Sequence, residues 1–178
     1  MRRFFLHGAA LAALAWGLGA PGPAGAQAAA TSLQAVDSLG RAMGRVGLQT
    51  GSGGLALRLL VDSVFTWVPL ATGDDGPELA FRAGGIVLFT DPDCSGPAFL
   101  SYGARGAGTR ASTVVTGGGR QLLYVADGAR TTDKLITHQF DGVDCTPYAG
   151  PSRRQPVWRA AWPAIDLGAL YAPPFTIR

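Results

Sequence analysis

The sequence predicts a single, mainly β domain, built as an antiparallel sandwich or an incomplete barrel with one disulfide. Three observations predict this class. First, 47% of the 178 residues are hydrophobic and only 15% are charged, a balance that excludes a disordered chain and favours a packed core. Second, short apolar runs alternate with turn residues about every ten positions, which is typical of sandwiches, barrels and meanders. Third, the 26 glycines follow no collagen period and, with the 12 prolines, supply turns.

Residues 1–26 have the pattern of a secretory signal peptide. Two arginines form its basic start, an apolar run follows, and Ala24-Gly25-Ala26 is a small-x-small cleavage site. Cleavage there leaves residues 27–178 as a single exported β-rich domain, which we expect to be periplasmic or secreted. Two alternatives stay open: an uncleaved membrane anchor, and export by the twin-arginine route, whose signal the arginine pair partly matches.

Charge and hydropathy exclude several classes of partner. Removal of residues 1–26 lowers the number of basic residues from 15 to 13 against 12 acids, a net charge of +1, so we expect no nucleic-acid partner. After the signal peptide we expect no membrane span, because the best candidate, residues 55–71, is too short and contains Arg58 and Asp62. The sequence does not identify a partner, and an envelope protein or a glycan is the suggestion that we carry forward.

Strands are predicted where an apolar run ends in a turn signal. Leu55–Val61 and residues 64–70 flank Asp62-Ser63, and alternation places Phe65, Trp67 and Pro69 on one face of the second run. The other predicted strands cover residues 86–90, 97–102, 112–116, 121–126, 134–140 and 175–177.

Three stretches are less regular. Residues 32–46 fit either an amphipathic helix or two strands around a turn at 37–40, and the strands are favoured because Gly40 and Gly44 would each cost a helix about 1 kcal/mol. Residues 150–163 contain three prolines and are predicted to cross the surface as an extended segment. Residues 103–108 are predicted to form a mobile loop.

Cys94 and Cys145 are the only cysteines. Export would place them in an oxidising compartment, where two thiols usually pair, so we predict a structural disulfide. This bond would tie the turn at residues 91–96 to the turn at residues 141–146.

The turn at residues 91–96 begins like a calcium-binding loop. Its D-x-D-x-S-G pattern makes Asp91, Asp93 and Ser95 the candidate metal ligands, because such loops place oxygen ligands on alternate residues. The twelfth position is Tyr102 instead of Glu, so the bidentate ligand is missing. The alternative is a tight turn in which the Asp side chains accept backbone hydrogen bonds. Calcium is the one cofactor that the sequence suggests.

The aromatic and histidine residues give two further hypotheses. Trp158 and Trp162 lie in a proline-rich stretch and are the best candidates for a ligand-binding surface, the alternative being packing in the core. His138 is the only histidine that remains after cleavage, and it could serve a hydrolase, although no G-x-S-x-G motif accompanies it.

Four motifs carry a resemblance to a known type of protein: Val36-Asp37-Ser38-x-Gly40, Val87-x-Phe89-x-x-x-Asp93-Cys94-Ser95-Gly96-Pro97-Ala98, Leu123-Tyr124-Val125 and the Pro173-Pro174-Phe175 ending. With these, the chain resembles uncharacterised bacterial exported β-rich domains that contain an Asp-Cys-Ser-Gly turn and that are sometimes found behind collagen-like or tail-fibre-like stalks. The resemblance implies a β-rich domain with a disulfide, and it implies no activity.

Three functions follow from the sequence. The leading expectation is an exported bacterial envelope protein that acts as a non-enzymatic structural or binding module. The second is a calcium- or glycan-binding module that uses the 91–96 turn together with Trp158 and Trp162. The third is a secreted hydrolase centred on His138.

Overall fold

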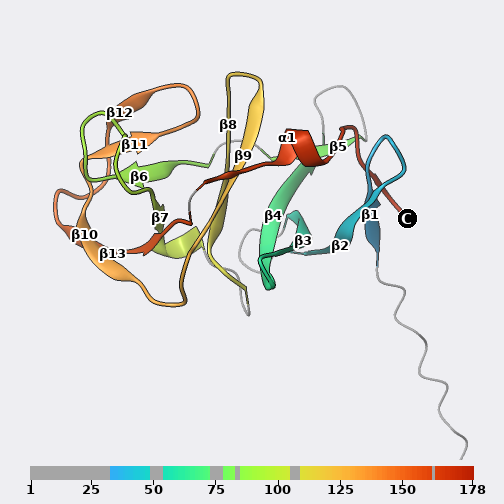
Figure 1. Ribbon diagram of the computed structural model, residues 1–178, viewed down its shortest axis with the longest axis horizontal. Coiled ribbons are helices and arrows are strands. Elements are labelled where there is room, and N and C mark those ends of the chain that lie inside the picture. Colours follow the sequence, from blue (N-terminus) through green and yellow to red (C-terminus); the bar gives the residue numbers. More distant parts are fainter. Residues whose placement is uncertain (1–32, 49–53, 73–77, 83–84, 105–108, 162) are drawn as a thin grey trace, which may run out of the picture. The chain divides into compact units, whose positions relative to one another are not determined.

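The chain folds mainly into antiparallel β-strands (Figure 1). A disulfide joins Cys94 to Cys145. One of the sheets is nearly closed into a barrel. The predicted fold class, a mainly β antiparallel sandwich or incomplete barrel with one disulfide, is therefore confirmed. The computed structural model describes residues 33–48, 54–72, 78–82, 85–104, 109–161 and 163–178. The predicted signal peptide at residues 1–26 and Trp162 lie outside the described residues. Among the described residues, no helix is both long enough and apolar enough to cross a membrane.

The first sheet has six strands in the order β15-β1-β2-β3-β4-β5. Its two edge strands nearly meet, because Leu79 and Phe175 exchange backbone hydrogen bonds of 3.3 and 2.8 Å. Closing a sheet in this way removes exposed edges that could pair with other chains. The strands are β1 (Gln34–Val36), β2 (Ala42–Leu48), β3 (Leu55–Val61), β4 (Val64–Thr72), β5 (Leu79–Phe81) and β15 (Thr176–Ile177).

Local sequence explains the hairpins of this sheet. Asp62 and Ser63 both adopt positive φ, 46° and 63°, so they form the two-residue turn whose twist suits a hairpin between β3 and β4. The strand interpretation of residues 32–46 is confirmed by β1 and β2. Gly44 is required there, because its φ is +158° and a Cβ would lie 2.5 Å from Arg58 O.

The faces of β4 differ in burial. Thr66, Val68 and Leu70 point into the core of the first sheet. Phe65, Trp67 and Pro69 share the other face, as predicted, and this face is the more exposed one. Alternation along the strand therefore predicted correctly which residues share a face. The burial pattern shows that the face with Thr66, Val68 and Leu70 is the one that points into the core.

A short sheet, β14-β9-β8, stands between the first sheet and the second (Figure 1). It consists of β8 (Ser112–Gly117), β9 (Arg120–Val125) and β14 (Ile165–Asp166), and the helix α1 (Leu167–Leu170) follows. The hairpin β8–β9 is buried on both faces: Leu123 and Val125 pack with the first sheet, whereas Tyr124 and Ala126 pack with the second. This double burial explains why residues 122–126 form a continuous apolar run instead of an alternating one.

The second sheet has the order β10-β13-β7-β6-β11-β12. Its strands are β10 (Thr132–Leu135), β13 (Arg154–Arg159), β7 (Phe99–Ser101), β6 (Val87–Phe89), β11 (His138–Phe140) and β12 (Cys145–Pro147), and the short 3-10 helix η1 (Tyr102–Ala104) follows β7. One face packs on the β8–β9 hairpin, and on the other face Leu88, Phe99, Ile136 and Val157 form a smaller cluster.

Two predictions about this sheet are wrong. Residues 134–140 were expected to be one strand, but the chain leaves β10 at Leu135, buries Ile136 and begins β11 on the other side of the sheet. Residues 150–163 were expected to cross the surface, but they contain β13, an interior strand. Pro156 is tolerated in β13 because it pairs with Asp133 of β10 at a position that β7 does not reach.

Candidate functional site

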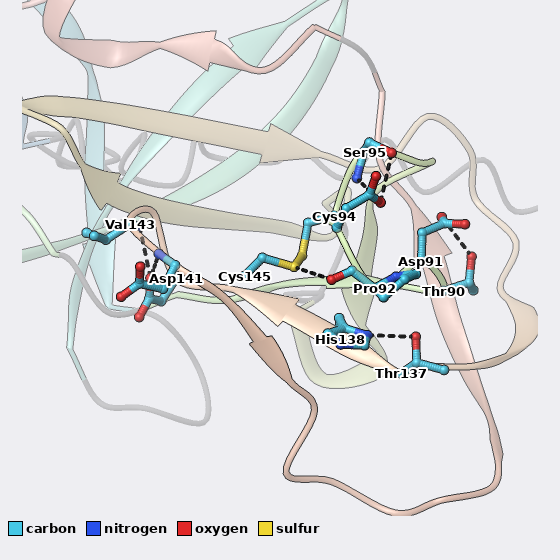
Figure 2. Close-up of a disulfide and its surroundings, with 12 residues drawn as sticks. Thr90, Asp91, Pro92, Cys94, Ser95, Thr137, His138, Asp141, Val143 and Cys145 are labelled. Carbon is cyan, nitrogen blue, oxygen red and sulfur yellow. Dashed lines mark hydrogen bonds between the residues drawn. A yellow bond between two sulfur atoms is a disulfide. The ribbon is translucent and has the colours of Figure 1, made fainter.

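The disulfide joins two turns of the second sheet (Figure 2). Cys94 lies in the loop between β6 and β7, and Cys145 begins β12, 51 positions later in the chain. The Sγ atom of Cys145 also lies 3.4 Å from Pro92 O. The bond therefore connects the predicted turns and fixes the loop after β6 against the outer edge of the sheet.

The candidate metal ligands have separate partners. The Oδ1 atom of Asp93 accepts hydrogen bonds from Ser95 N at 3.3 Å and from Ser95 Oγ at 2.9 Å. Asp91 instead accepts a hydrogen bond from Thr90 Oγ1 at 3.2 Å, and its carboxylate lies against Gly96, where a Cβ would collide with it. Figure 2 shows Asp91 directed toward Thr90 and away from Ser95. Both carboxylates therefore stabilise the turn locally.

The electrostatics of the two turns agree with this arrangement. Hydrogen bonds from Ser95 hold the pKa of Asp93 below its ordinary value. In the other turn, the backbone N–H groups of Asp144 and Val143 donate to Asp141 and lower the pKa of its carboxyl. Within the part of the chain that the structure describes, no cluster of three or more His, Cys, Asp or Glu side chains could hold a metal ion. Calcium binding by Asp91, Asp93 and Ser95 stays a prediction.

A pocket of about 410 Å³ adjoins the disulfide. Its walls come from β6, from the loop that contains Cys94, and from the end of β13; the lining residues are Phe89, Cys94, Ser95, Gly96, Pro97, Ala98, Arg159 and Ala160. The lining is largely apolar, and Ser95 and Arg159 are the polar side chains. Arg159 pairs with Asp127 across 3.6 Å but is 64% exposed, so this ion pair is weak and leaves the guanidinium accessible to a ligand.

Sequence reasoning found only part of this pocket. The 91–96 turn was proposed as a site, whereas Phe89 appeared only in a predicted strand and in the resemblance motif, and Arg159 was given no role. These two residues are 70 positions apart in the chain and come together only because β7 pairs with both β6 and β13. The signal that could have found Arg159 was its place beside Trp158, in a stretch that was interpreted as a surface segment.

Trp158 is buried, with 5% of its surface exposed, so the alternative that it packs in the core is borne out and a place on an open surface is contradicted. The reason is the interior position of β13 in the sheet. Its ring stacks on Tyr102 with a centroid distance of 6.3 Å, and its Nε1 donates to Tyr102 O. Trp158 also lines a second pocket, and its role as a ligand-binding residue stays a prediction. Trp162 lies outside the described residues.

His138 lies in β11, next to the disulfide in Figure 2. Its Nδ1 atom is 3.1 Å from Thr137 Oγ1. Among the described residues, no serine hydroxyl or carboxylate forms a hydrogen bond with the ring, so the geometry does not favour a Ser-His-Asp triad.

Comparison of the chain with protein-family models, with curated proteins and with solved structures found no match. Inference about function therefore depends on the geometry of the chain's own residues.

Proposed function

We propose that the chain is an exported, non-enzymatic binding module of the bacterial envelope, periplasmic or secreted, which takes a small envelope glycan in the pocket beside the disulfide. The observation that carries the proposal is this pocket of about 410 Å³, walled in part by Cys94 and its neighbours. The predicted signal at residues 1–26 and the disulfide support export, because stable disulfides form mainly outside the cytoplasm.

The size and lining of the pocket favour a small ligand. Pockets for small molecules enclose about 300–1,000 Å³ and combine apolar walls with a few polar groups. A protein partner would instead cover an area of about 800 Å² on each side. A sugar ring has apolar C–H faces for contact with Phe89 and Pro97, and its hydroxyls can bond to Ser95 and Arg159.

The disulfide gives the pocket a fixed shape. Because Cys94 is bonded to the start of β12 and Phe89 is held in β6, both the loop wall and the strand wall of the pocket are fixed to the second sheet. A wall that is already ordered costs less conformational entropy when a ligand binds.

Co-sedimentation with purified peptidoglycan tests this proposal. Ser95→Trp places a large side chain at the exposed edge of the pocket, and Ser152→Trp makes the same change at an exposed position outside its lining. We expect the wild type and Ser152→Trp to sediment with peptidoglycan. We expect the affinity of Ser95→Trp for peptidoglycan to be lower by at least about tenfold, which corresponds to about 1.4 kcal/mol of binding free energy.

Two results would contradict the proposal: a wild-type chain that stays in the supernatant, or equal sedimentation of both tryptophan variants.

The same assay in calcium and in EDTA tests the alternative role of Asp91 and Asp93 as calcium ligands. The pocket proposal expects equal binding in both buffers, whereas binding that requires calcium would favour a metal site in the turn.

A further inference from the structure

Arg110 lines two other pockets and has a buried side-chain nitrogen without a hydrogen-bond partner among the described residues. In the described part of the chain, Arg110 Nη1 is inaccessible to solvent and no acceptor bonds to it. Arg110 and Val64 line both pockets, which enclose about 210 and 340 Å³. A charged donor that is buried without an acceptor is costly, by about 1–3 kcal/mol or more.

The backbone of Arg110 is fixed in place. Its N–H donates to Phe65 O at 2.9 Å, and its carbonyl accepts a hydrogen bond from Thr66 Oγ1 at 3.3 Å. Thr66 of β4 and Arg110, which precedes β8, also form an isolated parallel bridge. β4 therefore holds the main chain of Arg110 beside the pockets that this residue lines.

The charges of the two pockets differ. The larger pocket includes Asp62 and Asp127, whose carboxylates would repel an anion. The smaller pocket is lined by Val64, Thr109, Arg110, Ala111, Gly128, Ala129 and Trp158. Arg110 is the one charged residue of this described lining, so the smaller pocket is the one that suits an anion.

The volume and the apolar lining of the smaller pocket also indicate that the rest of the ligand is a small apolar ring. Its volume of about 210 Å³ exceeds that of a cavity of about 150 Å³ that holds benzene. The indole of Trp158 and the small side chains of Ala111 and Ala129 give it apolar walls. The Nε1 of Trp158 is already bonded to Tyr102 O, so Trp158 offers a ligand mainly its ring surface.

We propose that the smaller pocket binds a small aromatic carboxylate, whose carboxylate accepts hydrogen bonds from Arg110 and whose ring packs against Trp158. Guanidinium groups pair well with planar carboxylates, and the pair is stronger where water is excluded. This site is separate from the glycan pocket, because Trp158 and Arg159 are successive residues of β13 and point to opposite faces of the sheet.

Calorimetric titration with sodium benzoate, and with neutral benzamide as the matched probe, tests the site. We expect saturable binding of benzoate at millimolar concentration or below, with benzamide about tenfold weaker because it lacks the charge. Arg110→Gln is expected to weaken benzoate binding about tenfold or more, whereas Arg153→Gln, which removes the same charge from an exposed position outside the pocket, leaves it unchanged.

A second variant keeps the test independent of Arg110. Ala129→Leu fills the pocket at its exposed edge, retains the arginine and is expected to abolish benzoate binding. The proposal is overturned if benzoate does not bind the wild type, if benzamide binds equally well, or if Ala129→Leu binds benzoate like the wild type.

Discussion

Removal of the Cys94–Cys145 disulfide is expected to lower the free energy of unfolding by about 4 kcal/mol. The bond closes a loop with a sequence separation of 51, and without it the unfolded chain gains the conformational entropy that this loop had lost. For a domain of this size the loss corresponds to a fall in melting temperature of roughly 8–16 °C. Thermal melts of the oxidised chain and of the double variant Cys94→Ala/Cys145→Ala measure it.

Dithiothreitol provides the control. It is expected to lower the melting temperature of the wild type to nearly that of the double variant, and to leave the double variant unchanged. A wild type that melts at the same temperature with and without the reductant would show that the bond does not stabilise the fold.

Shortening one core side chain in the β8–β9 hairpin, which packs against both sheets, is expected to cause the second largest loss of stability. Leu123 is fully buried in β9 and packs with the core of the first sheet. Leu123→Ala removes buried methyl groups and leaves a cavity, so the free energy of unfolding should fall by about 3 kcal/mol. Urea denaturation followed by circular dichroism measures the change.

Leu122→Ala is the matched control, because the same side chain is removed from the same strand. Leu122 is only partly buried and packs on the other core. Its truncation should cost less than half as much as that of Leu123. Equal losses for the two variants would contradict the assignment of faces. A single cooperative transition is expected in both, since the hairpin belongs to both cores.

Local signals account for much of the fold. Asp62-Ser63 and the glycines after β8 mark two-residue turns, and the apolar runs predicted as strands on either side of each turn pair as hairpins in the structure. The disulfide could also be predicted, because two cysteines leave one pairing within the molecule. These inferences succeeded because they depend on residues that are close in sequence or on the redox compartment.

Features that depend on distant pairing could not be predicted. Pro156 indicated an irregular segment, but it lies in a strand whose pairing with β7 begins only at Val157. The break at Ile136 arises because the cluster of Leu88 and Val157 buries this side chain, and no turn residue marks it. Arg110 gave no signal in the sequence, because its pockets form only when β4 and the segment before β8 come together.

The proposal that this chain works outside the cytoplasm as an oxidised module is tested most directly by mass spectrometry. The full chain is expressed in a Gram-negative host, the cells are fractionated, and free thiols are alkylated before digestion. We predict a periplasmic or secreted chain that begins at Gln27 and has no alkylated cysteine. A cytoplasmic chain that retains residues 1–26, with both Cys94 and Cys145 alkylated, would contradict the proposal.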